Sequence, residues 1–466
     1  MRISDYFDVA AERYPDRVAL IDQDVSIDFA QAQRIVHATA HALDKEPNLR
    51  PGAHVAIYSP NDFRVPLLHL AINRSDRAWL SVHTRNPVDV NIEVLSFMDC
   101  EFMFFHSAFE QLVPKLKASL PKTSRFICID RASEFGPSLE EWISPFSEPY
   151  RAGSENPLDT AFIQPTGGTT GPSKAAVHTH RSLEAMFIAS RENSRYTTDS
   201  RTLGVAPLTH AGGIGALATL SCGGSVVVMN MTSPDQVLEA IENSKITHVF
   251  LPPTLLYMLI DAMQKNPRDM SSLVQFTTGA APVAPEKIKQ ATKIFGPVMA
   301  EGFGQTECGM PLLWKHPEDY LGPDGSFDDQ VLASTGRAVV FARVEIMDEE
   351  GRILPPGQRG EIVVQANTMM REYYKNPQET EVFSRFGWGH TGDVGVKDDR
   401  GFVTIVDRLK DMIVTGGFNV FPAQIEAVIL EHDAVMECAV VGVPDEKWGE
   451  AVKAVVQLRP GKTVAA

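Results

Sequence analysis

The sequence predicts an α/β fold: a large N-terminal domain of parallel-rich sheets flanked by helices with a small β-barrel-like subdomain, then a small, partial α+β C-terminal domain. Short β-branched segments alternate with amphipathic segments through the first half and the middle of the chain, which is typical of a parallel sheet covered on both faces. After about residue 335, alternating strands are joined by Gly-Asp-rich turns, which favours antiparallel structure. The 466 residues exceed what one hydrophobic core usually organises. We expect a large domain at 1–408 and a small mobile one at 409–466.

The elements follow in order. Strand-like segments in the first half and the middle are HVAIYS (54–59), EFMFF (101–105), RFICID (125–130), TAFIQ (160–164), SVVVMN (225–230), THVFLP (247–252) and VQFTT (274–278). Helical segments such as VPLLHLAI (65–72) and FEQLVPKLKASL (109–120) lie between them. After the change of pattern, strands are expected at ARVEIMD (342–348), GEIVVQ (360–365) and GFVTIVD (401–407).

One helix start is well signalled in the middle of the chain. In SPDQVLEAIENS, Ser233 can cap the helix, Pro234 suits its first turn, and Gln236 completes a capping box. Val237, Leu238 and Ile241 would then form the apolar stripe of this helix.

Composition limits the classes of protein and of partner. Hydrophobic residues make up 44% and charged residues 22% of the chain, and the formal net charge is −16. This is an ordinary soluble composition, and the acidic balance argues against DNA or an anionic membrane as the main partner. The sequence contains no apolar run of about 18 residues, so no membrane span is expected.

The cysteines and the N-terminus suggest a location. Cys100, Cys128, Cys222, Cys308 and Cys438 form no C-x-x-C pair, which fits reduced thiols better than disulfides or a zinc site. The charged N-terminus MRISDYFDVAAERYPDR lacks the apolar stretch of a signal peptide. We expect a cytoplasmic protein.

The most informative segment is QPTGGTTGPSK (164–174), which follows a predicted strand. Its glycines, hydroxyls and Lys174 can offer N–H groups, O–H groups and a cation to a phosphate chain. The spacing is not that of a Walker A loop. The alternative interpretation of this segment is a flexible surface linker.

At this segment the chain resembles the adenylate-forming superfamily of acyl- and aryl-CoA synthetases, peptide-synthetase adenylation domains and beetle luciferases. Further matching motifs follow in the family's order: PLTHAGG (207–213), TTGAAP (277–282), EGFGQTE (301–307), HTGDVG (390–395) and DRLKDMIVTGGFNVFPAQIE (407–426). The resemblance implies an ATP-dependent enzyme that joins a carboxylic acid to AMP and then to coenzyme A, with Mg²⁺.

The resemblance also implies roles for individual residues. Thr306 would contact the α-phosphate, Glu307 would hold Mg²⁺, and Lys174 would act with them in catalysis. Phe303 would stack on adenine while Glu301 accepts from its amino group. Asp393 would take both ribose hydroxyls, a task for a two-oxygen acceptor. Other implied nucleotide-binding residues are Thr166, Gly167, Gly168, Thr169, Thr170, Gly171, Gly279, Ala280, Ala281, Gly302 and Arg408.

For the acid and for domain motion the resemblance points to other positions. His210 would stand at the mouth of the acyl pocket, although a lone histidine is more often structural. Lys410 would be the hinge, and Gly416 and Gly417 would enter the site for thioester formation. Phe187, Met310 and Leu312 are candidates for lining the acyl pocket. An aromatic, alicyclic or medium-chain acid is expected.

The chain also departs from the family. Its members carry a C-terminal lysine that contacts the carboxylate during adenylation, and Lys462 follows its strand too early to match that lysine. The chain therefore looks C-terminally truncated. Alternative functions are loading of a carrier protein, a luciferase-type reaction, and nucleotide or acyl-adenylate binding without full turnover. The expected partners are the acid, ATP and CoA, without nucleic acid, and a homodimer is possible.

Overall fold

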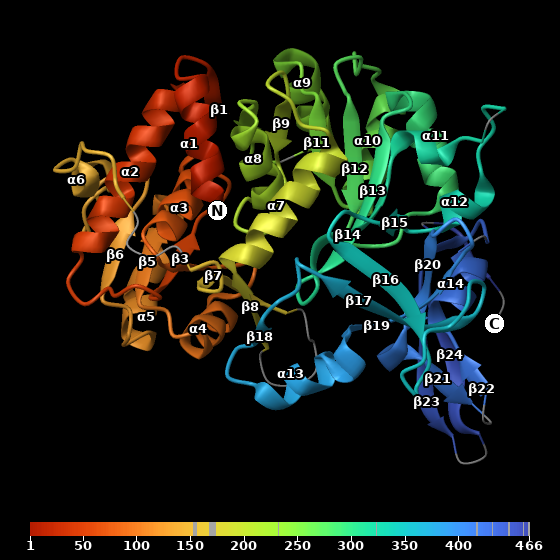
Figure 1. The fold of residues 1–466 in the computed structure, drawn as a ribbon. Helices are drawn as coiled ribbons and strands as arrows, with labels where there is room; N and C mark the ends of the chain where they lie inside the picture. The colour runs from red at the N-terminus through yellow and green to blue at the C-terminus, as the bar shows by residue number, and fades with distance from the viewer. Residues whose placement is uncertain are drawn as a thin grey trace.

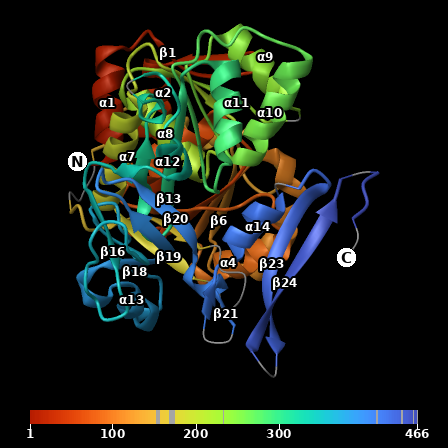
Figure 2. The same ribbon diagram turned by 90° about the vertical axis from the view of Figure 1, so that its right-hand side faces the viewer.

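The structure is a computed structural model of the chain. It describes residues 1–466 except 152–155, 167–173, 232, 323, 416–417, 431, 446–447, 460 and 465–466. The chain forms a large α/β body and a C-terminal β-rich part, and the hairpin β23–β24 projects from the body in both views (Figures 1 and 2).

The central sheet is mixed, with a parallel core. Its strands, in spatial order, are β15 (Arg337–Ala338), β14 (Gly309–Lys315), β13 (Met299–Gln305), β12 (Gln275–Gly279), β11 (His248–Leu251), β9 (Arg201–Gly204), β10 (Ser225–Val228), β1 (Val18–Asp22) and β2 (Val25–Asp28). The strands from β13 to β1 are parallel, whereas β14, β15 and β2 run antiparallel to their neighbours. The carboxyl ends of the parallel strands therefore share one edge.

The N-terminal sheet has the same character. Its strands are β18 (Glu372–Tyr373), β8 (Ala175–Thr179), β7 (Thr160–Pro165), β4 (Ala78–Leu80), β3 (His54–Tyr58), β5 (Phe102–Phe105) and β6 (Arg125–Cys128). All four residues of β5 are buried, as expected for a strand covered on both faces. The strands from β7 to β6 are parallel.

Helices separate and flank these sheets. Between them lie α1 (Ile3–Arg13), α2 (Phe29–Lys45), α3 (Arg64–Arg74), α7 (His180–Ser194) and α8 (Ala211–Ser221), which share one apolar core with both sheets. The far face of the central sheet packs against α9 (Pro234–Ser244), α10 (Pro253–Lys265) and α11 (Pro285–Phe295). The far face of the N-terminal sheet packs against α4 (Val88–Phe97) and α5 (Val113–Ser119).

Antiparallel sheets follow in the last third of the chain. One contains β16 (Ala342–Met347), β17 (Arg359–Ala366), β19 (Gly389–Lys397) and β20 (Val403–Arg408). The other contains β22 (Phe418–Val420), β21 (Ile413–Thr415), β24 (Gly449–Leu458) and β23 (Val435–Asp445). Between β18 and β19 lies α13 (Pro377–Phe383), and α14 (Pro422–Leu430) follows β22. The predicted parallel-to-antiparallel change is confirmed.

The structure also tests predictions for single residues. The predicted start of α9 is confirmed, since the Ser233 side chain accepts from the Gln236 N–H and Pro234 is the first helical residue. Two expectations for the acyl pocket are wrong. Phe187 packs against Tyr6 in the core between the sheets, with ring centroids 5.1 Å apart, and Leu312 is fully buried in another core cluster.

Candidate active site

The site begins where β12 and β13 reach their carboxyl ends. Gly279 lies opposite Gly302 in the parallel register, and Phe303 follows on the wall of an adjoining pocket. Ala280 comes next, with a φ of +68°, a left-handed conformation that an alanine adopts only at a cost. Ala281 is an exposed residue beside it. The backbone thus turns sharply at the end of the strand, beside Phe303.

A carboxylate from β19 faces this edge. Asp393 is 4% exposed, accepts a 2.7 Å hydrogen bond from Gln305 Nε2, and has its Oδ1 3.6 Å from Arg408 Nε. Burial raises the pKa of Asp393 to about 6, although Arg408 and Gln305 both act to lower it. A buried, anchored carboxylate with a raised pKa favours a ligand that brings its own hydrogen-bond donors.

The ends of the predicted phosphate loop meet beside the N-terminal sheet. The Thr166 N–H donates to the Lys174 carbonyl at 2.9 Å, so the segment closes between β7 and β8. Gly167, Gly168, Thr169, Thr170 and Gly171 lie outside the described residues. The Lys174 ammonium contacts Glu379 at 2.7 Å and lies 5.6 Å from the centre of the Tyr373 ring.

Tyr373 connects this lysine with the motif of β13. Its hydroxyl donates to Glu307 Oε1 at 2.8 Å, and burial together with Glu307 raises the pKa of Tyr373. His178 Nε2 contacts the carbonyl of Thr306 at 2.7 Å. Thr306 and Glu307 are therefore each fixed by a ring from the N-terminal sheet.

Glu301 has a different environment from that expected. One of its carboxylate oxygens forms a buried ion pair with Lys315 at 3.0 Å, and the Lys315 side chain is fully buried. Lys315 also donates to the carbonyls of Val331 and Leu332, at 3.0 and 3.4 Å. This carboxylate is thus tied to the body of the protein, and its contact with adenine stays a prediction.

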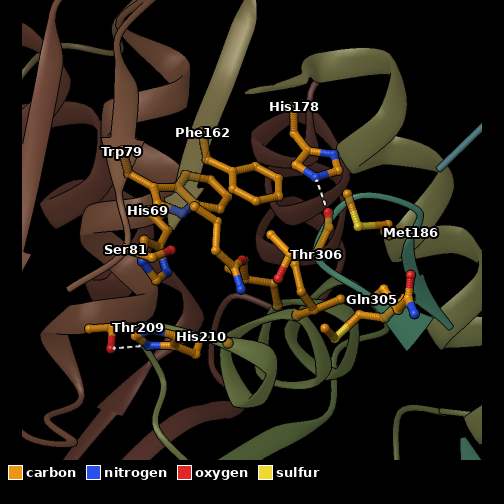
Figure 3. Close-up of a pocket in the computed structure, with 16 residues that line it drawn as sticks. His69, Trp79, Ser81, Phe162, His178, Met186, Thr209, His210, Gln305 and Thr306 are labelled. Carbon is orange, nitrogen blue, oxygen red and sulfur yellow. Dashed lines mark hydrogen bonds between the residues drawn. The ribbon is translucent and has the colours of Figure 1, made fainter. Parts of the chain in front are cut away.

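His210 and Thr306 line the same pocket as a column of rings packed against one another (Figure 3). From α3 across β4, β7 and β8, the column consists of His69, Trp79, Phe162 and His178, with successive centroids 4.6, 4.9 and 4.5 Å apart. Burial lowers the pKa of His69 to about 3 and of His178 and His210 to about 4. These imidazoles are therefore neutral at pH 7.

The loop that carries His210 is held from the N-terminal sheet. The Asn61 side chain contacts the carbonyls of Gly204, Val205, Ala206 and Met229 at 3.0–3.2 Å and accepts from the Leu208 N–H at 2.9 Å. His210 Nδ1 then pairs with Thr209 Oγ1 at 3.0 Å. Asn61 thereby joins the carboxyl end of β3 to the loop before α8.

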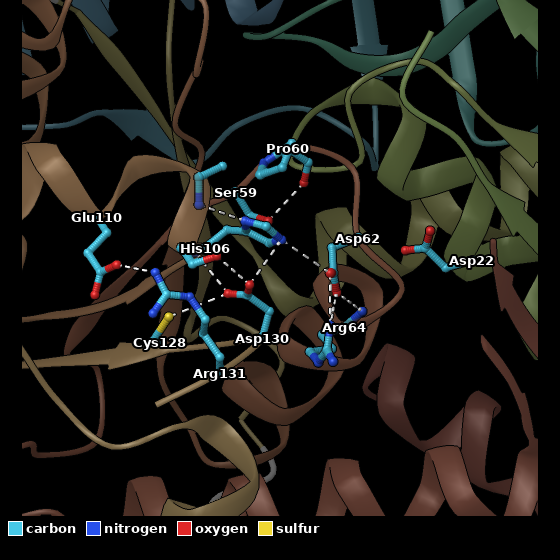
Figure 4. Close-up of polar contacts among 12 residues, drawn as sticks. Asp22, Ser59, Pro60, Asp62, Arg64, His106, Glu110, Cys128, Asp130 and Arg131 are labelled. Carbon is cyan, nitrogen blue, oxygen red and sulfur yellow. Dashed lines mark hydrogen bonds and ion pairs between the residues drawn. The ribbon is translucent and has the colours of Figure 1, made fainter. Parts of the chain in front are cut away.

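A polar network fixes the turn on which Asn61 lies (Figure 4). Both oxygens of Asp62 contact Arg64, at 3.1 and 2.9 Å. His106 Nε2, after β5, lies 3.7 Å from Asp62 and 3.6 Å from Asp130, which follows β6. The network occupies the carboxyl ends of β3, β5 and β6, so the loops of the N-terminal sheet are tied to one another.

The predicted hinge residues lie at the end of β20. Arg408 is the last residue of that strand, and the exposed Lys410 lies in the single turn after it. Gly416 and Gly417 lie outside the described residues. Lys462 is exposed in a turn after β24.

Mg²⁺ is implied by the family, and Glu307 fits it. Among the described residues no three His, Cys, Asp or Glu side chains are grouped to hold a metal ion. A single carboxylate is nevertheless a typical protein ligand for Mg²⁺, because substrate phosphates and water complete its coordination. In the described part of the chain, none of the helices is long and apolar enough to cross a membrane.

The structure brings together Gly279, Ala280, Gly302, Phe303, Thr306, Glu307, Asp393 and Arg408 around one edge, with Lys174 linked to them through Tyr373. Sequence reasoning missed Gln305, Tyr373, His178 and Asn61. Gln305 lies within the EGFGQTE motif, so its position was the available signal. The others act across strands or sheets, and nothing in their sequence spacing reveals those contacts.

The chain matches known families along most of its length. The family model described as AMP-binding enzyme matches residues 7–374, and that of the AMP-binding enzyme C-terminal domain matches residues 424–466. A medium/long-chain-fatty-acid–CoA ligase, FadD8 of Mycobacterium tuberculosis, is 42% identical over 294 residues, which are 63% of this chain and half of that protein.

Other relatives match nearly the whole chain. A 3-[(3aS,4S,7aS)-7a-methyl-1,5-dioxo-octahydro-1H-inden-4-yl]propanoyl:CoA ligase of Rhodococcus jostii is 32% identical over 98% of this chain and 88% of its own length. The solved structure of the amide bond synthetase McbA from Marinactinospora thermotolerans has a TM-score of 0.87, with 29% identity over 99% of this chain and 90% of that one.

Proposed function

The chain belongs to the AMP-binding enzyme family, among the acyl-CoA synthetases, and we propose that it activates a carboxylic acid as an acyl-AMP and transfers the acyl group to coenzyme A. The observation that carries the proposal is the convergence of Thr306–Glu307, Asp393 and the Lys174–Tyr373 pair on one sheet edge. These groups suit an α-phosphate, a ribose and a triphosphate respectively.

In the proposed first step, an acid oxygen attacks the α-phosphorus of ATP and pyrophosphate leaves. Both reactants are anions, so the site must neutralise charge and align them in line. Lys174 supplies a cation and Thr306 a hydroxyl donor. Bound Mg²⁺ would neutralise phosphate charge, and Glu307 would hold it, oriented by the Tyr373 hydroxyl at 2.8 Å.

The neutral histidines suit the acid side of this step. His210, with a pKa lowered to about 4 by burial and by His83, can hydrogen-bond the carboxylate without forming a fixed ion pair that would make it a weaker nucleophile. Asn61 would act by holding the backbone around His210. In the second step the thiol sulfur of CoA attacks the acyl carbonyl, the thiol proton is lost, and AMP leaves.

ATP–pyrophosphate exchange tests the first step, with Mg²⁺, a panel of acids and no CoA. Acid-dependent exchange is expected, followed by acyl-CoA and AMP formation when CoA is added. Exchange that proceeds without any acid would contradict the proposal. So would a protein that binds AMP but shows no exchange with any acid of the panel.

A second candidate differs only in the acceptor. The similarity to an amide bond synthetase over 99% of the chain favours testing an amine as the nucleophile. Parallel reactions with CoA and with simple amines separate the two, because each product is distinct in mass. Amide without thioester would favour the second candidate.

A further inference from the structure

The pocket lined by His69, His178 and His210 is called the histidine pocket below. A second pocket lies between the central sheet and α7–α8, and it adjoins the histidine pocket at Ile214 and Met310. It holds about 940 Å³ of space between atoms, including the part open to solvent. Its floor is one face of β9, β11, β12 and β13, and α7 and α8 cover it. This is the cavity in which the acid of the proposed reaction would lie.

The depth of the pocket follows from the strand register. Gly302, near the predicted nucleotide, lies level with Gly279, and His248, at the opposite end, lies level with Gln275. The four residue steps from 275 to 279 correspond to ~13 Å, at about 3.3 Å per residue. The pocket is therefore long enough for a substituted ring joined to a short chain.

The walls suit flat groups. A Cβ on Gly302 would lie 2.7 Å from the Trp314 ring, so the indole lies directly on the backbone of β13. Tyr196, Phe250 and Phe303 contribute further rings. Aromatic faces and bare backbone form a slot that stabilises a ring by stacking.

Charge is absent from this lining. Within the described residues, no Lys, Arg, Asp or Glu lines the pocket, and burial lowers the pKa of His248 to about 4, so it is neutral at pH 7. An ionised group in the deep part of the pocket would be buried without a partner, at a cost of several kcal/mol. A second carboxylate on the acid is therefore disfavoured.

The far end is nevertheless polar. Thr202 and Thr219 share a hydrogen bond of 2.7 Å, and Thr219 contacts the Gly215 carbonyl at 2.9 Å, so Thr202 donates and keeps acceptor capacity. The half-buried Tyr196 packs against His248, with ring centroids 4.8 Å apart. Hydroxyl groups therefore meet the part of the acid furthest from its carboxylate.

We propose that the preferred acid is ring-containing and uncharged beyond its carboxylate, with a hydroxyl or carbonyl group at its far end. This inference rests on the proposed function and names its substrate class. The uncharged polar substituent meets Tyr196 and Thr202, the ring lies against Trp314, and the carboxylate reaches the edge at Gly302.

The experiment compares acids of matched size. In ATP–pyrophosphate exchange, 3-(4-hydroxyphenyl)propanoic acid should exceed 3-phenylpropanoic acid about tenfold in kcat/KM, since one hydrogen bond contributes about that factor. 3-(4-Carboxyphenyl)propanoic acid and nonanoic acid should be weaker still. Equal rates with nonanoic acid, or a preference for the dicarboxylic acid, would overturn the inference while leaving adenylation intact.

The affinities of stable acyl-AMP analogues should rank the four acyl groups in the same order, without any need for turnover. Acyl-sulfamoyl-adenosines with these four acyl groups are stable analogues of the acyl-AMP, and calorimetry gives their affinities. If exchange fails with every acid, the proposed reaction is contradicted, whereas the order of these affinities still tests the pocket. An affinity order led by the nonanoyl or the carboxyphenyl analogue would refute the substrate class.

Two variants locate the effect. Tyr196→Phe should remove most of the preference for the hydroxylated acid, while Tyr6→Phe, whose hydroxyl contacts Glu184 at 2.6 Å outside the pocket, should not change it. Gly215→Ala places a Cβ 3.3 Å from the Tyr196 oxygen at a helical position that alanine favours. It should reduce kcat/KM for the hydroxylated acid severalfold without lowering Tm, and propanoic acid should be unaffected. An unchanged preference in both variants would place the polar contact elsewhere.

Discussion

Asp393 gives the sharpest test of the nucleotide site. Its carboxylate is 4% exposed and has a pKa of about 6, against an ordinary value of 3.8, so ionisation there costs about 3 kcal/mol. A hydrogen bond to a charged group, such as one from a ribose hydroxyl to this carboxylate, contributes about 1.5–3 kcal/mol. Asp393→Asn should therefore weaken adenosine binding by about 2–3 kcal/mol, roughly 30- to 150-fold.

The pH dependence follows from the same group. The raised pKa means that the Asp393 carboxylate binds a proton below pH 6, and a ribose that donates to the carboxylate must displace that proton. Adenosine affinity should therefore fall about tenfold from pH 7.5 to pH 5. The pocket histidines do not contribute, because the pKa values of His69, His178 and His210 lie at about 3 to 4.

Calorimetry with adenosine, which does not itself titrate over this interval, measures both effects. At pH 6 the wild type should release a fraction of a proton when adenosine binds. The observed binding enthalpy should then depend on the ionisation enthalpy of the buffer. Asp398→Asn, in an exposed turn of the same sheet, is the matched control. A pH slope that survives in Asp393→Asn would refute the assignment.

Three further changes test other parts of the site. Tyr373→Phe removes the 2.8 Å hydrogen bond to Glu307 and should raise the Mg²⁺ concentration for half-maximal exchange about tenfold; an unchanged Mg²⁺ titration would count against the contact. Ala280→Gly relieves a φ of +68° and should stabilise the protein by about 1 kcal/mol, which urea unfolding measures; a loss of stability would show that the turn is unstrained. Lys315→Met leaves Glu301 buried without its ammonium and should cost about 3–5 kcal/mol, with Lys315→Met/Glu301→Gln recovering most of it. If the single variant unfolds like wild type, the pair contributes little.

Much of this fold can be predicted from the chain because its parallel strands are nearly continuous apolar runs. The segments 54–59, 101–105 and 225–230 all contain observed strands. By contrast, β4 has three residues and β18 has two. Both strands are too short to show a hydrophobic pattern that could be recognised in the sequence. Their places depend on pairing with β3, β7 and β8, which local patterns do not specify.

The candidate site shows the same division. Thr306, Glu307 and Asp393 can be found through motifs, because neighbouring residues in the same short segments belong to the same predicted site. Tyr373 meets Glu307 only because β18 pairs with β8 beside the motif of β13. Glu301 meets Lys315 across an antiparallel pair. Contacts of this kind require the sheet order, which the sequence does not reveal.

The ring column has an optical consequence. Trp79 lies between His69 and Phe162 on the wall of the histidine pocket, and Trp314 lies on the wall of the neighbouring pocket. Trp142, Trp388 and Trp448 line neither pocket. Indole emission responds to nearby ring stacking, proton transfer and hydration, so arrival of a substrate at either pocket should change the intrinsic fluorescence. Single Trp→Phe variants at 79 and 314 would then separate the two signals, and stopped-flow mixing could time the filling of each pocket without a label.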